Sequence, residues 1–154
     1  MSFGGLDHIG FAVADLERST AWYTRLLGEA PTIRKAVGPG YIGEIVGYPE
    51  CRMKWALWRL PNNTMLELIQ YLMPDAAHAD METYTIGNGH VCLVTDDIEG
   101  DGERMRGHAE FRSPRPVTIP VGPYQGVRAW YIRDPDGITV ELIEAPSNGP
   151  QVAA

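Results

Sequence analysis

The chain has 154 residues and a net charge of −7, with 44% hydrophobic and 21% charged residues. This composition is typical of an ordinary globular domain and argues against a disordered chain or a coiled coil. The acidic balance and the lack of a Lys/Arg run also exclude nucleic acid and an anionic membrane surface as expected partners.

Two cysteines, Cys51 and Cys92, are too few to hold together a fold of this size, so we expect a reduced, cytoplasmic protein. The first residues have neither a basic region nor an apolar segment of the kind found in secretory signals. No apolar run reaches the roughly 20 residues that are needed to cross a bilayer. The sequence therefore predicts a soluble protein.

Two parts of the chain are similar to each other. Residues 8–17, HIGFAVADLE, match residues 90–99, HVCLVTDDIE, at an offset of 82. Residues 66–70, LELIQ, match residues 140–144, VELIE, at an offset of 74. The two offsets differ by eight residues, which places an insertion in the middle of the first half. The pattern indicates a duplicated chain.

The predicted elements follow the same order in each half. Apolar residues alternate from Ile9 to Val13, which predicts a strand, and Asp15 is suited to cap a helix that ends at Gly28. The second half is expected to begin in the same way. Further elements are predicted as strands at 53–60 and 65–71, a strand at 89–95, a helix from about 98 to 106, and strands at 128–133 and 138–144.

Segments 41–46 and 115–121 are the candidates for one more strand in each half. The chain is then a single domain of residues 1–154, made of two βαβββ modules at about 6–73 and 86–145. The stretch from Pro74 to Tyr84 is expected to link the modules. The predicted fold class is α+β.

Four polar side chains occupy repeat-related positions. His8 and His90 open the first strand of each half, and Glu67 and Glu141 interrupt the last strand. Any one of them alone would be a solvent-facing residue, but two carboxylates that converge inside a sheet are costly unless a cation binds both. Two His and two Glu suit Ni, Co, Zn, Mn or Fe(II), with two octahedral positions left for water or substrate. We therefore predict an open metal site.

The chain resembles the vicinal oxygen chelate superfamily over residues 6–145. That superfamily contains glyoxalase I, methylmalonyl-CoA epimerase, extradiol dioxygenases and the fosfomycin and bleomycin resistance proteins. The resemblance is carried by HIGFAVADL from His8, the WYxxxLG pattern from Trp22, LEL at 66–68, GHV at 89–91, and DPDGxxxEL from Asp134.

The resemblance implies paired βαβββ modules that form a cupped mixed sheet with helices outside and a divalent metal on the concave face. It places His8, Glu67, His90 and Glu141 at the four ligand positions, the set found in glyoxalase I. The epimerase has Gln at the position of Glu67, the dioxygenases use two His and one Glu, and bleomycin-binding members lack the metal set. Homodimers are common in the superfamily.

The sequence differs from glyoxalase I and from the epimerase at positions that bind or act on their substrates, so neither substrate can be assigned to this chain. Glyoxalase I follows its first-module Glu with residues, including an Asn, that hold glutathione, whereas Glu67 is followed by LIQY at 68–71. The epimerase has a second catalytic Glu on the strand that corresponds to 53–60, and this stretch contains no acid here.

The inserted residues fall near 37–49, a Gly/Pro-rich stretch that is equally consistent with a substrate lid and with a surface loop. Glu44 within it is the best acid outside the four ligands. Of Trp55 and Trp58, at least one is expected in the core and the other in the pocket. Cys92 shares the face of His90 and is expected to be a small buried hydrophobe.

These observations favour a divalent-metal-dependent isomerase or lyase. Its small-molecule substrate would offer adjacent oxygens to the metal, which stabilises the enediolate formed when the α-proton leaves. The resemblance implies that Glu141 acts as base, with Glu67 a weaker candidate and Glu44 an alternative if the lid closes. Two other functions stay open: an Fe(II)-dependent ring-cleaving dioxygenase and a non-enzymatic binder of small molecules such as antibiotics.

Overall fold

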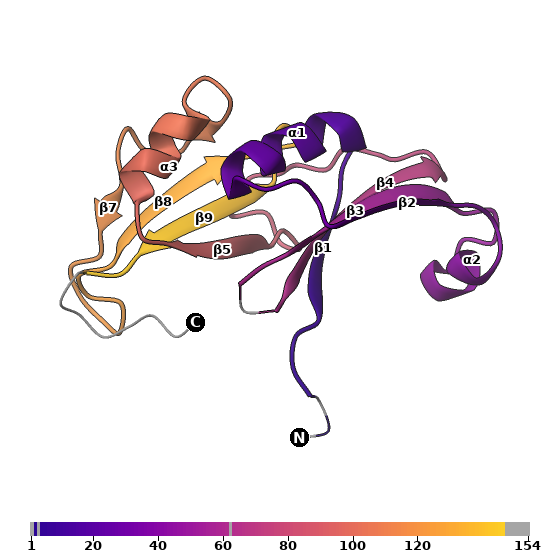
Figure 1. The fold of residues 1–154 in the computed structure, drawn as a ribbon, viewed down its shortest axis with the longest axis horizontal. Coiled ribbons are helices and arrows are strands. Elements are labelled where there is room, and N and C mark those ends of the chain that lie inside the picture. The colour runs from indigo at the N-terminus through magenta and orange to yellow at the C-terminus, as the bar shows by residue number, and fades with distance from the viewer. Residues whose placement is uncertain (1, 3, 62, 147–154) are drawn as a thin grey trace. The chain divides into compact units, whose positions relative to one another are not determined.

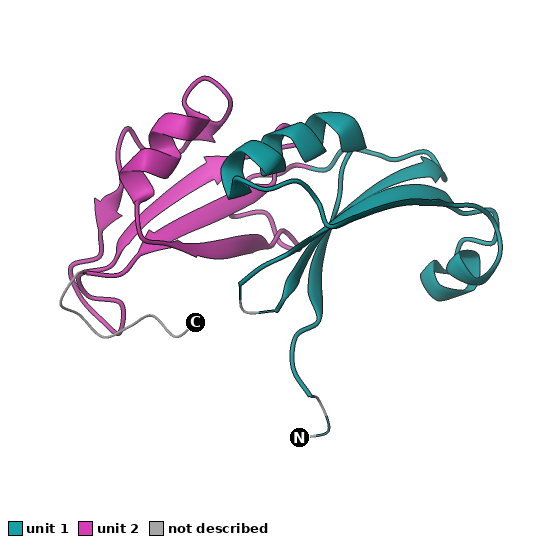
Figure 2. Ribbon diagram, viewed as in Figure 1, with its two compact units in different colours: residues 1–79 teal, residues 80–154 magenta. Residues whose placement is uncertain are grey.

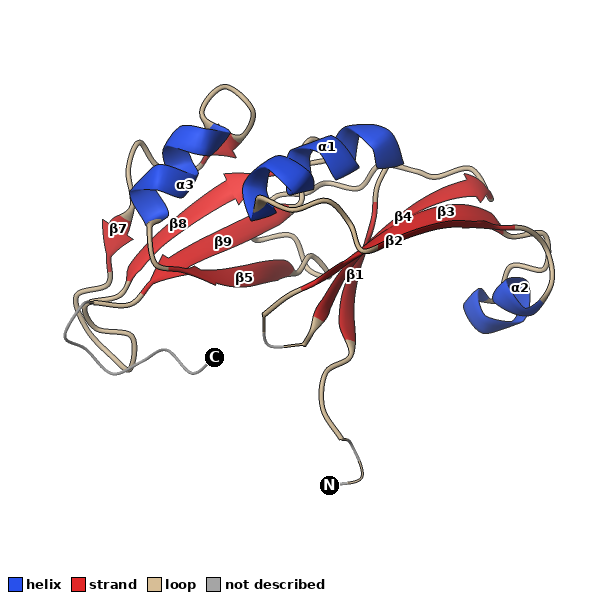
Figure 3. Ribbon diagram, viewed as in Figure 1, coloured by secondary structure: helices blue, strands red, loops and turns tan. Residues whose placement is uncertain are grey.

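The computed structural model describes residues 2, 4–61 and 63–146. The chain divides between residues 79 and 80 into two compact units, unit 1 and unit 2 (Figure 2). Each unit contains a mixed β-sheet of its own (Figures 1 and 3). The first unit contains β1 (His8–Ala12), α1 (Leu16–Leu27), β2 (Ile33–Val37), α2 (Tyr41–Val46), β3 (Arg52–Arg59) and β4 (Met65–Met73). The second contains β5 (His90–Thr95), α3 (Ile98–Met105), β6 (Glu110–Phe111), β7 (Val117–Thr118), β8 (Arg128–Arg133) and β9 (Thr139–Glu144).

In unit 1 the strand order is β1-β4-β3-β2, with β1 parallel to β4 and the other pairs antiparallel. Helix α1 packs against β3 and β4 on one face of this sheet. Strand alternation turns Leu66 and Leu68 toward the helix, where both are fully buried, and Tyr23 and Trp58 are buried with them. The intervening residue, Glu67, therefore lies on the opposite face of the sheet, away from α1.

The ends of α1 are those that the sequence predicts. The Asp15 carboxylate accepts hydrogen bonds from the backbone N–H groups of Glu17 and Arg18, at 2.9 and 3.0 Å. Gly28 ends the helix in the left-handed conformation, at φ 75°, which favours glycine. The cap thus sets where the helix begins after β1, and the glycine sets where it ends before β2.

Unit 2 repeats this arrangement. Its sheet has the order β5-β9-β8-β6, with β5 parallel to β9 and β7 paired with β8. Helix α3 packs against β9, and Ile98, Met105 and Val140 are fully buried in the core between helix and sheet. Asp97 caps α3 by accepting a hydrogen bond from the N–H of Gly100, as Asp15 caps α1. The α+β fold class predicted from the repeats is confirmed.

The predicted strand at 41–46 is wrong: this segment is helix α2, and the additional strand of unit 1 is β2. The helical conformation is closed by the N–H of Gly47, which donates to the carbonyl oxygen of Gly43 at 2.9 Å. Helix α2 falls in the inserted stretch, between β2 and β3. In unit 2 the additional strand β7 does lie within the predicted segment 115–121.

Within the described residues, no helix is long and apolar enough to cross a membrane.

Candidate metal-binding site

The first half of the candidate site is a His–Glu pair on the sheet face that is turned away from α1. Strand β1 carries His8 and runs beside β4, with Gly10 directly opposite Glu67. Because paired residues point to the same side of a sheet, His8, Gly10 and Glu67 share one face. His8 Nε2 lies 3.7 Å from Glu67 Oε2. We call this face of the unit 1 sheet the ligand face.

Asp7 supports this pair from the other side of the imidazole. The Asp7 carboxylate oxygen lies 2.9 Å from His8 Nδ1, so Nδ1 donates its proton to the carboxylate. The Nε2 lone pair is then directed to the Glu67 side of the ring. A carboxylate behind a histidine in this way is the usual outer support of a metal-ligating imidazole. The His8 donor set therefore fits a cation.

Glu67 is largely enclosed, with 18% of its side chain exposed. Burial raises the pKa of the Glu67 carboxyl above its ordinary value, while the neighbouring His8 opposes the shift. Gly10 leaves room for this carboxylate: a Cβ at that position would lie 3.2 Å from Glu67 Oε2. A cation at the carboxylate would offset the cost of enclosing it.

Unit 2 holds the repeat-related pair. His90 Nε2 lies 3.1 Å from Glu141 Oε2, and 18% of the Glu141 side chain is exposed. Cys92 on β5 and Tyr131 on β8 stand on either side of Glu141 in the register of the sheet. The Tyr131 ring also lies beside the His90 ring, with a centroid separation of 5.4 Å. Unit 2 thus has a cysteine where unit 1 has Gly10, although the two carboxylates are equally exposed.

Cys92 is exposed, and the expectation of a buried hydrophobe is wrong, because alternation places it on the open face with His90 and not on the α3 side. Partial burial of the sulfur, followed by the charge of Glu141, raises the pKa of Cys92 to about 12. The thiol is therefore protonated at neutral pH and is a poor nucleophile.

The remaining predicted residues are distributed as follows. Trp58 is buried and donates its indole N–H to the carbonyl oxygen of Glu29 at 2.9 Å. Trp55 is half-buried on the ligand face, in register with Ile69. Glu44 is exposed on α2, and in the part of the chain that the structure describes it has no hydrogen bond or ion pair.

The two pairs lie in different units. Among the described residues, no group of three or more His, Cys, Asp or Glu side chains is arranged to hold a metal ion. Each unit brings together one His and one Glu. The convergence of all four side chains on one cation stays a prediction, and so does a catalytic role for Glu67, Glu141 or Glu44.

One repeat-related pair was missed by the sequence analysis. Arg59 and Arg133 are separated by the same offset of 74 that relates Glu67 to Glu141. Both arginines end the strand next to the Glu-bearing strand, β3 in unit 1 and β8 in unit 2. The offset of 74 is the signal in the sequence that relates these two cations.

A duplicated α+β chain with one His–Glu pair on each βαβββ unit defines a known class of proteins. The family model described as "Glyoxalase/Bleomycin resistance protein/Dioxygenase superfamily" matches residues 5–142. The chain belongs to this superfamily, as its motifs predict.

Curated relatives span almost the same length. A lactoylglutathione lyase of Salmonella typhimurium is 32% identical, with 92% of this chain and 93% of the relative covered. A 2-epi-5-epi-valiolone epimerase of an Actinomyces species is 26% identical, with 93% and 80% covered. A solved glyoxalase family protein of Bacillus cereus shares the fold, with a TM-score of 0.79 at 21% identity over 94% of this chain and 95% of that one.

Proposed function

We propose that this protein is a divalent-metal-dependent isomerase or lyase that transfers a proton next to a carbonyl group of a small-molecule substrate. The observation that carries the proposal is the pair of repeat-related His–Glu contacts, at 3.7 and 3.1 Å, on equivalent strands of two duplicated units. A structural role would not require the same two residue types at the same two positions twice.

His8, Glu67, His90 and Glu141 are the residues that would hold the cation, whether the two pairs come from one chain or from two copies in a homodimer. A bound divalent cation supplies Lewis-acid polarisation of a substrate oxygen. The donor set of two imidazoles and two carboxylates suits Ni, Co, Zn, Mn or Fe(II). Asp7 keeps the His8 ring in the tautomer that such ligation needs.

Glu141 is the residue that we assign as the base. The superfamily resemblance supports this role, because members that carry a neutral Gln at the position of Glu67 are active. The local structure distinguishes the two carboxylates: Glu141 has Cys92 and Tyr131 beside it in the register of the sheet, where Glu67 has Gly10 and Leu57.

The relatives support the reaction type and leave the substrate open. One is named a lyase and the other an epimerase, and both names are compatible with proton transfer beside a carbonyl. Gln70, which follows Glu67 on β4, binds the carbonyl oxygen of Ala14 and the N–H of Leu16 with its amide. It therefore serves the start of α1 and is unavailable to a substrate on the ligand face.

The experiment that tests the proposal is proton exchange in D2O, followed by NMR, with a panel of hemithioacetals of 2-oxoaldehydes, 2-methyl-branched acyl-CoA esters and cyclic polyhydroxy ketones. The metal-loaded protein is expected to introduce deuterium at the carbon next to the carbonyl of at least one substrate. Oxygen consumption with a catechol, in the absence of any exchange, would contradict the proposal and favour the dioxygenase. A protein that neither exchanges protons nor takes up metal would favour the non-enzymatic small-molecule binder.

Two matched variants test the assignment of the base. Glu67→Gln is expected to keep metal and a measurable exchange rate, whereas Glu141→Gln is expected to keep some metal and to lose most of kcat. Both are assayed at saturating metal, and each changes one repeat-related carboxylate to an amide of the same size. Equal losses in the two variants would reject the asymmetry.

A further inference from the structure

Unit 1 carries a group of cationic side chains on two adjacent strands of its sheet. Within the described residues, four of them have no hydrogen bond or ion pair, and all four lie on β2 or β3: Lys35, Arg52, Lys54 and Arg59. Most arginines of unit 2 are paired with carboxylates, for example Arg128 with Glu144 and Arg106 with Glu103. The chain as a whole is acidic, with a net charge of −7. Four cations without an ion pair in the described residues are nevertheless gathered on two adjacent strands of unit 1.

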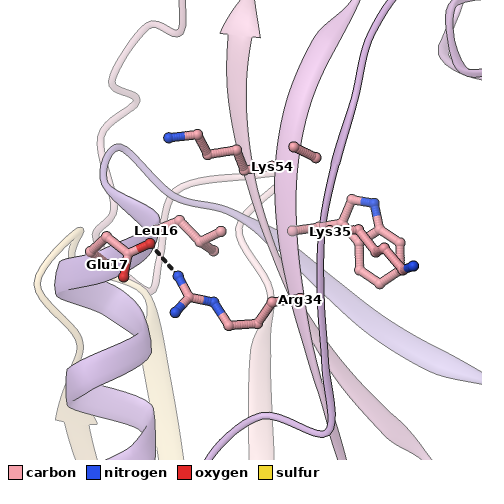
Figure 4. Close-up of a pocket in the computed structure, with 7 residues that line it drawn as sticks. Leu16, Glu17, Arg34, Lys35 and Lys54 are labelled. Atoms are coloured by element: carbon pink, nitrogen blue, oxygen red, sulfur yellow. Dashed lines mark hydrogen bonds and ion pairs between the residues drawn. The ribbon is translucent and has the colours of Figure 1, made fainter.

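The register of the sheet divides these cations between its two faces. Lys54 is opposite Gln70, whose amide binds the start of α1, so Lys54 lies on the helix side. It lines a shallow pocket there with Leu16, Glu17 and Arg34, and Figure 4 shows Arg34 reaching toward Glu17. In the same view Lys35 points away from Glu17.

Arg59 lies on the ligand face. It is opposite Met65, which is in turn opposite His8, so the three residues form one row across β3, β4 and β1. Glu67 is two residues further along β4. From the spacing of strands and residues, the Cα atoms of Arg59 and Glu67 are about 8 Å apart. Lys35 shares this face but is one strand further from Glu67.

The duplication provides an internal comparison. Arg133, the repeat-related residue of unit 2, is 10% exposed, pairs with Glu82 at 2.9 Å and donates to the carbonyl oxygen of Met81 at 3.2 Å. Glu110 is directly opposite Arg133 on β6. In unit 1 strand β2 begins at Ile33, opposite Leu57, so β2 places no carboxylate beside Arg59. Within the part of the chain that the structure describes, the same position thus holds an ion-paired arginine in unit 2 and an exposed arginine without an ion pair in unit 1.

We propose that Arg59 binds an anionic group of the substrate, a phosphate or a carboxylate that lies a few bonds from the oxygens held at the His–Glu site. This inference rests on the proposed function and narrows it to anionic substrates. A guanidinium forms two parallel hydrogen bonds with such a group, which fixes both the position and the orientation of the ligand. Arg59 is a specificity residue in this role.

The test compares two ligands that differ by one anionic group, dihydroxyacetone phosphate and dihydroxyacetone, both with a carbonyl and an adjacent hydroxyl. Their dissociation constants are measured by ligand-observed NMR on zinc-loaded protein and on protein in EDTA. The wild type is expected to bind the phosphate ester about tenfold more tightly than the neutral ligand in both states. Arg59→Gln is expected to lose this preference, and Arg59→Lys to keep part of it.

Lys54→Gln is the matched control, because it removes the same charge from the same strand on the opposite face and is expected to keep the preference. Loss of the preference in both Arg59→Gln and Lys54→Gln would show that the preference depends only on the overall charge of the protein, and would contradict the proposal. Absence of a preference in the wild type, its retention in Arg59→Gln, or its loss in Lys35→Gln alone would also overturn it. Failure to take up zinc would contradict the metal site, while an Arg59-dependent preference in EDTA would still support the anion site.

Discussion

The two candidate half-sites have the same ligands but different neighbours. Position 10 in unit 1 is a glycine, and its counterpart in unit 2 is Cys92. Leu57 stands opposite Glu67, whereas Tyr131 stands opposite Glu141. Duplication has thus preserved the residues that would hold a cation and changed those that surround them. This difference is a physical basis for giving Glu141 and Glu67 different tasks.

The glycine at position 10 gives a prediction for metal affinity. Gly10→Ala would place a Cβ 3.2 Å from Glu67 Oε2, so the carboxylate must move by a few tenths of an ångström away from its place beside His8. Disturbance of a ligand in this way is expected to weaken metal binding about tenfold. Competition with a chromophoric chelator measures the affinity.

Gly38→Ala is the control for this variant, because an added Cβ at that position has no neighbour within 4 Å. It is expected to bind metal as the wild type does. An unchanged affinity in Gly10→Ala would show that the position of the Glu67 carboxylate does not matter for metal binding.

The duplication in the sequence singled out the four candidate metal ligands. The repeat offsets relate His8 to His90 and Glu67 to Glu141, and the structure brings one His and one Glu together in each unit, whereas the convergence of all four stays a prediction. Asp7 and Tyr131 could not be found in this way. Asp7 acts through the orientation of one ring nitrogen, and Tyr131 through strand register, and neither leaves a pattern in the sequence.

Among the elements, those with strong local signals were predicted well. Helix α1 has a capping aspartate and a terminal glycine, and its observed start and end follow from these two residues. Strand β2 has no such signal. It is mostly exposed and carries Arg34 and Lys35, as edge strands often do to prevent pairing with other chains, so it lacks the apolar alternation of an interior strand.

The segment 41–46 was predicted as a strand and is a helix in the structure. Its short apolar stretch is ambiguous between a strand and a helix. The structure resolves this through Gly43, where an added Cβ would lie 2.7 Å from the carbonyl oxygens of Tyr48 and Pro49. Only a glycine allows the chain to turn back so closely, and α2 is the result. The packing of this turn depends on residues outside the segment, which periodicity within it cannot report.

The packing of α3 on its sheet gives a prediction for stability. A Cβ at position 102 would lie 2.2 Å from the Trp130 ring, which is buried and held by a hydrogen bond from its indole N–H to the carbonyl oxygen of Ser113. The ring cannot move aside cheaply. Gly102→Ala is therefore expected to lower the free energy of unfolding by about 2 kcal/mol, measured by urea denaturation.

A double-mutant cycle distinguishes this clash from a general effect on the helix. In a Trp130→Phe background the smaller ring frees the space, and Gly102→Ala is expected to cost less there than in the wild type. Equal costs in the two backgrounds would contradict the proposed contact.

For the whole molecule, the duplication was the most informative feature of the sequence. It predicted the α+β class and the repeated order of elements, which two mixed sheets with similar topology confirm. The substrate could not be predicted in the same way. Arg59, the residue proposed to select it, is exposed and has no hydrogen bond or ion pair within the described residues, so its identity is free to change between relatives that share one scaffold.

The central claim is that the two His–Glu pairs hold one divalent cation, and elemental analysis of the protein after metal loading and gel filtration tests it most directly. We expect close to one ion per chain in the wild type and in His78→Ala, a control at an exposed histidine. We expect His8→Ala and His90→Ala each to lose most of the metal. Full retention in both variants, or two ions per chain with one lost in each variant, would contradict a site shared by the two pairs.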